Sequence, residues 1–374
     1  MAKKVKENKN SNNRSLSNAK QAKQDEFYTQ LVDISAEVRH YRAQFRDKVV
    51  LCNCDDPYES NFFRYFALNF NELGLRQLIA TSFTKSPIVG GHLPLVDIEG
   101  LKPDSKEPYA IEINEVPDHN NDGAIDLADV EYLLRHQANV AHTLKGEAGY
   151  NAGDFRTEEC IEYLKAADIV VTNPPFSLFR DYVAQLIEYD KKFLIIGNLN
   201  AVHYSEIFKL LKENKIWLGE SIHSGDREFR VPDHYPLEAA GTRIDDEGNK
   251  YIRVKGVRWF TNMDNPNRHE WLPLYKPYSP EEYPTYDNLD AIEVSATSEI
   301  PVDYDGLMGV PDSFMDKFNP DQFELVGIPF GNLGKEIGVT RNHRGRTDIA
   351  FTKNGRTKSP YSRLIIRRKD ANAN

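Results

Sequence analysis

Four consecutive residues, Asn173-Pro174-Pro175-Phe176, have the groups needed to hold a planar amine. The two prolines lack backbone donors and keep the chain extended, and Pro174 biases Asn173 away from helical backbone angles. The Asn173 amide oxygen and the Pro174 carbonyl then offer two fixed acceptors for the two amine hydrogens. With Phe176 stacked on the ring, the amine lone pair can leave conjugation and attack an electrophile without a strong general base. The alternative is an Asx-Pro turn after a strand.

The sequence around this motif alternates between strand and helix patterns. Short apolar runs rich in branched residues predict buried strands at 48–54, 76–83, 167–173 and 191–198. Intervening amphipathic patterns predict helices at 60–70, 127–140, 157–167 and 178–189. This alternation predicts the α/β class, with a doubly wound, mostly parallel sheet. Ligands bind beyond the carboxyl ends of such strands, and Asn173 lies at one of them.

The charge of the chain is unevenly distributed. Its 374 residues carry a net charge of −10, yet residues 1–24 contain seven Lys or Arg and one acid, and residues 335–369 contain eleven and two. Concentrated basic ends could bind phosphates, or they could be solubilising tails. No apolar run approaches the ~18 residues of a membrane helix, and the N-terminus lacks a signal-peptide core. We therefore expect a cytoplasmic monomer with no membrane contact.

The Asn-Pro-Pro-Phe motif resembles the catalytic signature of S-adenosylmethionine-dependent amino-methyltransferases. Two further stretches match that group: "DEFYT" (25–29) is similar to its N-terminal cofactor motif, and "GDF" (153–155) to the motif that contacts the cofactor's adenine. Four more narrow the resemblance to the EcoRI-type adenine-specific DNA methyltransferases, from about residue 25 to the end. They are, in order, "VVLCNCDDPYESNFFRYF", "VRWFTN", "DYDGLMGVPDSF" and "YSRLIIRR".

The resemblance implies a Rossmann-like methyltransferase fold and a methyl transfer from S-adenosylmethionine to adenine N6 in duplex DNA. The host would be a restriction-modification or anti-restriction system. Residues 1–24 would be a disordered basic tail, 25–215 the cofactor-binding and catalytic α/β domain, and 216–374 a β-rich segment that completes the fold and carries target-DNA recognition. Short strand candidates in that segment are 251–260, 323–330 and 362–368.

The same resemblance implies the cofactor contacts. The residues concerned are Asp25, Phe27, Tyr28 and Thr29 around the methionine end, and Asp154 and Phe155 around the adenine. One departure matters: Cys54-Asp55-Asp56-Pro57 follows the first strand, where many methyltransferases have a glycine-rich loop. Asp55 or Asp56 could accept from the methionine ammonium, and Pro57 could shape the turn. The second strand ends in Thr81-Ser82 without an acid for the ribose, so ribose binding is unassigned.

Contacts with DNA are expected from aromatic and basic residues. A target adenine must be flipped out of the duplex, and Trp259 or Phe260 could stack on it, although core packing is the stronger alternative for both. Residues 300–330 are rich in Pro, Gly and aromatics and predict a shaped loop region, a candidate for target recognition. The candidate phosphate or base contacts are Arg341, Arg344 and Arg346 in a loop, and Arg363, Arg367 and Arg368 near the C-terminus.

Other functions fit parts of this pattern. Asn-Pro-Pro-aromatic motifs also occur in methyltransferases of RNA bases or protein glutamine, which usually lack a long β-rich C-terminal part with a basic end. A catalytically silent nucleic-acid-binding protein on the same fold is a third possibility, disfavoured by the intact motif.

The stretch "DHNNDGAIDLAD" (118–129) resembles a calcium loop, with Asp118, Asn120, Asp122 and Asp129 at ligand positions. Position twelve is Asp and not Glu, and a strand pattern precedes the loop where a calcium-binding EF-hand has a helix. We favour the alternative of an Asp-Gly turn leading to Asp126 as a helix cap, with Asp129 in the first turn of that helix.

Overall fold

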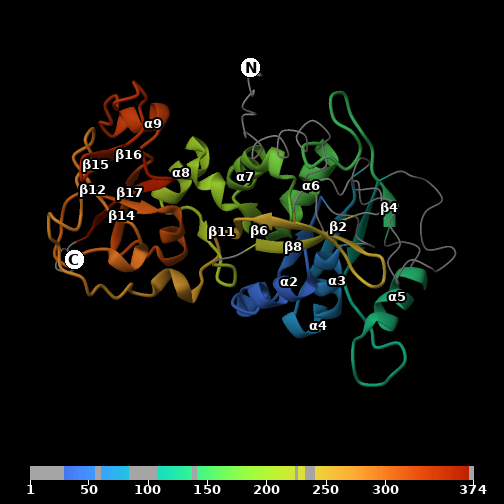
Figure 1. The fold of residues 1–374 in the computed structure, drawn as a ribbon. Coiled ribbons are helices and arrows are strands. Elements are labelled where there is room, and N and C mark those ends of the chain that lie inside the picture. The colour runs from blue at the N-terminus through green and yellow to red at the C-terminus, as the bar shows by residue number, and fades with distance from the viewer. Residues whose placement is uncertain are drawn as a thin grey trace, which may run out of the picture. The chain divides into compact units, whose positions relative to one another are not determined.

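The computed structural model describes residues 29–54, 60–83, 108–136, 141–223, 226–231 and 241–369, and no side chains at 135, 136, 141 and 142 (Figure 1). The predicted tail and several predicted cofactor residues lie outside these ranges: Asp25, Phe27, Tyr28, Asp55, Asp56 and Pro57. No helix in the described ranges is long and apolar enough to cross a membrane.

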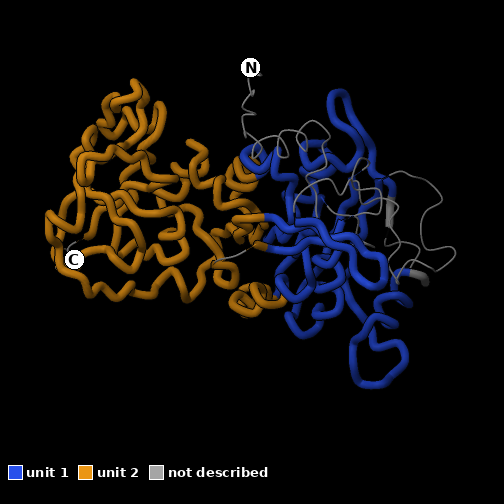
Figure 2. Tube along the Cα trace, in the orientation of Figure 1, with its two compact units in different colours: residues 1–34, 47–182, 227–254 blue, residues 35–46, 183–226, 255–374 orange. Residues whose placement is uncertain are grey.

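Two compact units make up the chain, and neither is one continuous stretch (Figure 2). Unit 1 consists of residues 1–34, 47–182 and 227–254, and unit 2 of residues 35–46, 183–226 and 255–374. Both units therefore draw on residues before and after position 216.

The helices form where the sequence supplies caps and apolar faces. Ser60 caps α3 by accepting from the backbone N–H groups of Phe62 and Phe63, and Thr157 caps α6 by accepting from that of Cys160. The α-helices are α2 (Leu31–Val38), α3 (Asn61–Leu68), α4 (Phe70–Leu73), α5 (Leu127–His136), α6 (Glu158–Ala166), α7 (Phe179–Glu188), α8 (Ser205–Lys212) and α9 (Gly331–Glu336). The 3₁₀-helices are η1 (Arg42–Phe45), η2 (Phe176–Leu178), η3 (Leu199–His203), η4 (Pro266–His269), η5 (Thr297–Glu299) and η6 (Asp312–Lys317).

Unit 1 contains a mixed sheet in the order β4-β3-β2-β1-β5. Its strands are β1 (Val49–Cys52), β2 (Gln77–Thr81), β3 (Tyr109–Ile113), β4 (Ala141–Thr143) and β5 (Ile169–Thr172). Strand β1 runs parallel to β2 and β5, with Val50 opposite Leu78 and Ile169. Strand β3 runs antiparallel to β2, and β4 runs antiparallel to β3. The prediction of a sheet with parallel strands is therefore confirmed for β1, β2 and β5, whereas β3 and β4 add antiparallel pairs that the sequence pattern did not predict. A second sheet, β8-β10-β9, consists of β8 (Asp226–Val231), β10 (Lys250–Lys255) and β9 (Thr242–Ile244).

Unit 2 is built mainly on antiparallel pairs, and β12 and β13 are the parallel pair. Strands β6 (Lys192–Asn198), β11 (Val257–Thr261) and β7 (Trp217–Leu218) pair in the order β6-β11-β7. Strands β12 (Ile292–Glu293), β13 (Met308–Pro311), β17 (Arg363–Arg368) and β14 (Phe323–Gly327) form a sheet in the order β12-β13-β17-β14. Strands β15 (Phe351–Lys353) and β16 (Arg356–Lys358) form a separate hairpin.

Two predictions about residues beyond 250 need correction. The strand predicted at 251–260 is two strands, β10 and β11, separated at Gly256. The loop region predicted at 300–330 contains β13, η6 and β14, and its aromatic residues Phe314 and Phe323 pack edge to face, 5.1 Å apart, in the core. The aromatic content of that segment therefore supplies a core as well as loops.

Candidate active site

Three strand ends in unit 1 bring the predicted motifs to one edge of the sheet. Because β1, β2 and β5 are parallel, the residues that follow them lie at the same edge. Asn53 follows β1, Ser82 follows β2 and Asn173 follows β5. This arrangement is the one expected for a ligand site in an α/β sheet.

Asn53 ties this edge together. Its backbone carbonyl accepts a hydrogen bond from the Thr172 hydroxyl, and its side-chain oxygen accepts one from the Tyr182 hydroxyl. All three residues are buried, and burial raises the pKa of Tyr182 well above its ordinary value, so this hydroxyl stays a donor. Thr172 directly precedes the Asn-Pro-Pro-Phe motif and Tyr182 lies on α7, which follows it. One residue therefore holds the motif from both sides.

The motif presents its groups at two depths. Asn173 is 2% exposed, whereas Phe176 is partly exposed at the start of η2. The Pro175 backbone is extended, with φ −54° and ψ 122°, and its carbonyl accepts from the Leu178 N–H at 2.9 Å. A buried amide beside a partly open aromatic ring is the arrangement that the proposed amine chemistry needs.

The "GDF" loop reaches the same edge because of its glycine. Gly153 has φ +76°, and a Cβ there would lie 1.9 Å from the backbone oxygen of Ser82. Only glycine lets this loop lie so close to the end of β2. Two residues later, buried Phe155 packs edge to face on Tyr182, with ring centroids 5.0 Å apart. The loop therefore joins both β2 and the residue that binds Asn53.

Asp154 is held by an arginine that the sequence reasoning did not single out. Arg156 donates to both carboxylate oxygens of Asp154, at 2.8 and 2.7 Å, and this bonding raises the pKa of Arg156. The guanidinium also lies over the Tyr150 ring, 4.5 Å from its centroid. Asp154 Oδ1 also accepts from the Arg156 backbone N–H at 3.1 Å, so Oδ2 is the oxygen that keeps an acceptor site for a ligand. In the sequence, the spacing of two residues between Asp154 and Arg156 is the signal that could have revealed this ion pair.

Two buried hydroxyls at this edge lack partners. Thr29 and Thr81 are 3% and 1% exposed, and neither side-chain oxygen has a hydrogen-bond partner within the described ranges. The Thr29 carbonyl accepts from Asn61 at the start of α3, at 2.8 Å, while Thr81 ends β2. An unsatisfied buried hydroxyl costs about 1–3 kcal/mol, so these positions suit a polar ligand.

The end of β1 adopts a backbone conformation that glycine favours although no glycine is present. Cys54 has φ +74°, in the left-handed region, which costs a non-glycine residue about 1–3 kcal/mol. Its side chain is buried and donates to Asn53 Oδ1 over 3.6 Å. The loop after β1 therefore lacks glycine, as the sequence shows, but its backbone at Cys54 still has the left-handed conformation that glycine favours.

The aromatic residues predicted to stack on a flipped base lie in the core of unit 2. Trp259 and Phe260 are 1% and 0% exposed in β11, which pairs with β6 and β7 on its two sides. The structure therefore favours core packing, the alternative weighed above, over base stacking for both residues.

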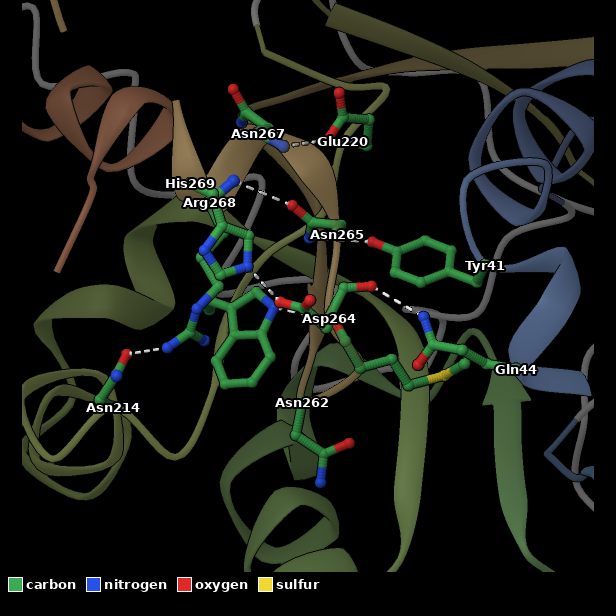
Figure 3. A network of polar contacts seen from close by, with 12 residues as sticks. Tyr41, Gln44, Asn214, Glu220, Asn262, Asp264, Asn265, Asn267, Arg268 and His269 are labelled. Carbon is green, nitrogen blue, oxygen red and sulfur yellow. Dashed lines mark hydrogen bonds and ion pairs between the residues drawn. The ribbon is translucent and has the colours of Figure 1, made fainter. Parts of the chain in front are cut away.

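A polar network fixes the chain after β11 (Figure 3). Gln44 donates to the Asp264 carbonyl at 2.8 Å, and Asn265 donates to the Tyr41 hydroxyl at 3.2 Å. The Arg268 guanidinium lies 3.5 Å from the centroid of the Trp217 ring. These contacts join η1 and β7 to the exit of β11 and keep that strand in place.

The six predicted basic residues fall into three groups. Arg363 is paired with buried Glu293, 2.5 Å between Nη2 and Oε1, and Glu293 also accepts from Tyr286. This structural pair removes Arg363 from the candidate DNA contacts. Arg367 and Arg368 form surface ion pairs with Glu324 and Asp305, at 3.4 and 2.8 Å. The third group, exposed in one loop, is Arg341, Arg344 and Arg346.

The predicted calcium loop uses its polar side chains to bind its own backbone. Asp118 accepts from the Gly123 N–H at 2.8 Å, and Asp122 from that of Ala124 at 2.9 Å. Asp129 accepts from the N–H groups of Asp126 and His119, which lower its pKa. Within the described ranges, no group of three His, Cys, Asp or Glu residues is placed to hold a metal ion. The contacts of these residues, like that of Asn120 with Asp122 at 2.8 Å, fit the capped turn.

Comparisons with known proteins cover nearly the whole chain. The family described as adenine-specific methyltransferase EcoRI matches residues 15–369. The Type II methyltransferase M.EcoRI of Escherichia coli is 43% identical over 367 residues, which cover 96% of this chain and 98% of that protein. M.MpnI of Mycoplasma pneumoniae is 37% identical over 360 residues, or 94% and 97%, and M.MgeORF184P of Mycoplasma genitalium 35% over 358 residues, also 94% and 97%. The search among solved structures gave no match.

The contact between Gly153 and Ser82 generates a test of how this edge is assembled. We expect Gly153→Ala to lower the free energy of unfolding in urea by about 1–3 kcal/mol, because the new Cβ overlaps backbone. Gly149→Ala is the matched control, since Gly149 also has positive φ, +99°, but a Cβ there meets nothing within 4 Å. Equal losses in the two variants would mean that backbone strain, and not the close approach to β2, sets the requirement for glycine.

Proposed function

Because the chain belongs to the family of EcoRI-type adenine-specific methyltransferases, we propose that it methylates the N6 amine of a flipped-out adenine in duplex DNA. It would serve a restriction-modification or anti-restriction system. The observation that carries this proposal is the meeting of the Asn-Pro-Pro-Phe motif, the "GDF" loop and the end of β1 at one sheet edge.

The residues at this edge suit S-adenosylmethionine, which when bound supplies an electrophilic methyl group on its sulfonium. We assign Asp154 as the acceptor for the amine of the cofactor's adenine and Phe155 as the aromatic residue beside that same adenine ring. The unpartnered Thr81 hydroxyl ends β2, where related nucleotide sites hold the ribose, and supports a ribose contact. Thr29 would lie at the methionine end. Residues outside the described ranges would complete that end: Asp25, Phe27, Tyr28, Asp55, Asp56 and Pro57.

Groups of the chain would orient the N6 amine of the target adenine. Asn173 Oδ1 and the Pro174 carbonyl would accept its two hydrogens, which turns the lone pair out of conjugation. Phe176 would stack on the base and hold the ring plane. Two fixed acceptors in a buried site would stabilise the positive charge that develops on nitrogen as its bond to the methyl group forms and the sulfur–methyl bond breaks, because they require no reorganisation. One of the two amine hydrogens would then leave as a proton. Extruding the base costs a few kcal/mol, which contacts between chain and DNA must supply.

The finer architecture is also a proposal. We propose a doubly wound, Rossmann-like arrangement around β1, β2 and β5, with residues 25–215 carrying the cofactor site and residues 216–374 carrying target recognition. Arg341, Arg344 and Arg346 are the first candidates for duplex DNA, and Arg367 and Arg368 would have to exchange ion pairs for phosphates. The working state would be a cytoplasmic monomer.

The acceptor class is tested most simply with tritiated S-adenosylmethionine and three acceptors: duplex DNA, RNA and protein. We expect label in DNA alone, recovered as N6-methyladenine after digestion to nucleosides. Label in RNA or in glutamine side chains would support the other amino-methyltransferase classes. Binding to DNA without any transfer would support a silent binding protein.

Removal of the Asn173 amide tests the catalytic assignment. We expect Asn173→Ala to reduce turnover on the order of a hundredfold or more, because it deletes one of two acceptors that act as the amine attacks. Cofactor affinity, measured by calorimetry, should stay near the wild-type value. Full turnover in this variant would sink the proposed site.

Two substitutions of Phe176 test whether its ring stacks on the target base. Phe176→Ala should lose most turnover, whereas Phe176→Tyr should retain it because the ring remains. Initial rates of methyl transfer on DNA are the measurement, with thermal unfolding as a check that both variants fold. A silent Phe176→Ala would remove the stacking role and leave Asn173 as the supported part of the motif.

A further inference from the structure

The β15–β16 hairpin has no buried face along most of its length. Residues 352–358 are all exposed, on both faces of the ribbon, and only Phe351 at its base is partly buried. Within the described ranges, β15 and β16 pair only with each other. A two-stranded hairpin with two solvated faces gains little from its own contacts. Its formation here must be supported from its base.

That support is present and makes the hairpin a fixed projection. Asn354 and Gly355, with φ +54° and +71°, form the two-residue turn that matches the twist of the flanking strands. At the base, Phe351 packs against Tyr286, with ring centroids 6.2 Å apart, and the Thr352 hydroxyl donates to Asp287 at 2.9 Å. The ribbon is therefore anchored at one end, and Lys353 Nζ also donates to the Glu282 carbonyl at 3.3 Å, while both faces stay exposed.

A second element, the loop before the hairpin, is built on two buried asparagines. Asn342 Oδ1 accepts from the backbone N–H groups of Arg344 and Arg346, at 2.8 and 3.1 Å, and folds the loop into a tight turn. Asn288 donates to the carbonyls of Thr340 and Asp348, at 2.8 and 3.0 Å, and accepts from the N–H of Ala350 at 3.0 Å. The backbone from 340 to 350 is therefore fixed while its arginines point to solvent.

The charge on these two elements is strongly positive in a protein whose net charge is −10. Residues 341–358 contain six Lys or Arg and one acid, Asp348. All six basic side chains are exposed, and none forms an ion pair with a carboxylate of the described residues. The six are Arg341, Arg344, Arg346, Lys353, Arg356 and Lys358. Arg367 and Arg368, in contrast, are paired with acids.

We propose that the β15–β16 hairpin enters the major groove of the target duplex. The loop before the hairpin, residues 340–347, would contact the phosphates on either side of that groove. The major groove is about 12 Å wide and admits a two-stranded ribbon. Arg356, the first residue after the turn, would reach base edges, while Lys353 and Lys358 would contact the backbone. This inference rests on the proposed function, and it adds the element that reads the DNA.

The test uses the full chain with three charges removed from the hairpin: Lys353→Gln, Arg356→Gln and Lys358→Gln. The matched control removes three exposed charges elsewhere in unit 2 that also have no carboxylate partner among the described residues, by Lys212→Gln, Lys255→Gln and Lys317→Gln. Methylated sites are first mapped by sequencing DNA treated with the wild type. Affinity is then measured over a range of salt on two short labelled duplexes, one with a mapped site and one without.

We expect the hairpin variant to bind the site duplex more weakly than the control variant does. The slope of log affinity against log salt should fall by roughly 0.9 for each phosphate that the variant no longer neutralises. Arg356→Gln alone should lower the preference for the site duplex by about tenfold, as removal of a bond to a base edge would. Equal affinity, slope and site preference in hairpin and control variants would overturn the hairpin proposal. A wild type that methylates no duplex would overturn the proposed function itself.

Discussion

The hydrogen bonds accepted by Asn53 are the constraint on which the candidate active site depends. Asn53, directly after β1, accepts hydrogen bonds from two hydroxyls. One belongs to Thr172, which precedes the Asn-Pro-Pro-Phe motif, and the other to Tyr182, which follows it. Phe155 of the "GDF" loop packs on the same Tyr182 ring. Asn53 lies far from the other two segments in sequence. The hydrogen bonds hold the three segments together because a buried polar atom without a partner would cost free energy.

Burial explains which parts of this site could be predicted from the sequence. Strands β1 and β5 are buried at every position and, apart from Thr172, apolar, because both faces are covered. A run like "IVV" therefore predicts a strand, and the end of that strand predicts a ligand site. Tyr182 gave no such signal, since its partner Asn53 is 129 residues away. Arg156 was missed although its partner Asp154 is only two residues away, whereas the residue types around Cys54 do not encode its left-handed backbone.

The same argument explains the uneven outcome for DNA contacts in unit 2. Trp259 and Phe260 have side chains that suit either a base or a core, and the pairing of β11 on both sides decides for the core. Arg363 is as basic as Arg356 in the sequence, yet Glu293, 70 residues away, neutralises it. Six exposed charges without carboxylate partners, which only the structure reveals, distinguish the 341–358 segment from Arg363, Arg367 and Arg368.

A double-mutant cycle between Asn53 and Tyr182 tests the central claim most directly. Single-turnover methyl transfer to DNA would be measured for wild type, Asn53→Ala, Tyr182→Phe and the double variant, all at saturating cofactor. Because both changes remove one hydrogen bond that orients the motif, each should slow transfer on the order of tenfold, and the double variant should be no slower than the worse single one. Losses that simply multiply, or single variants as fast as wild type, would contradict this account.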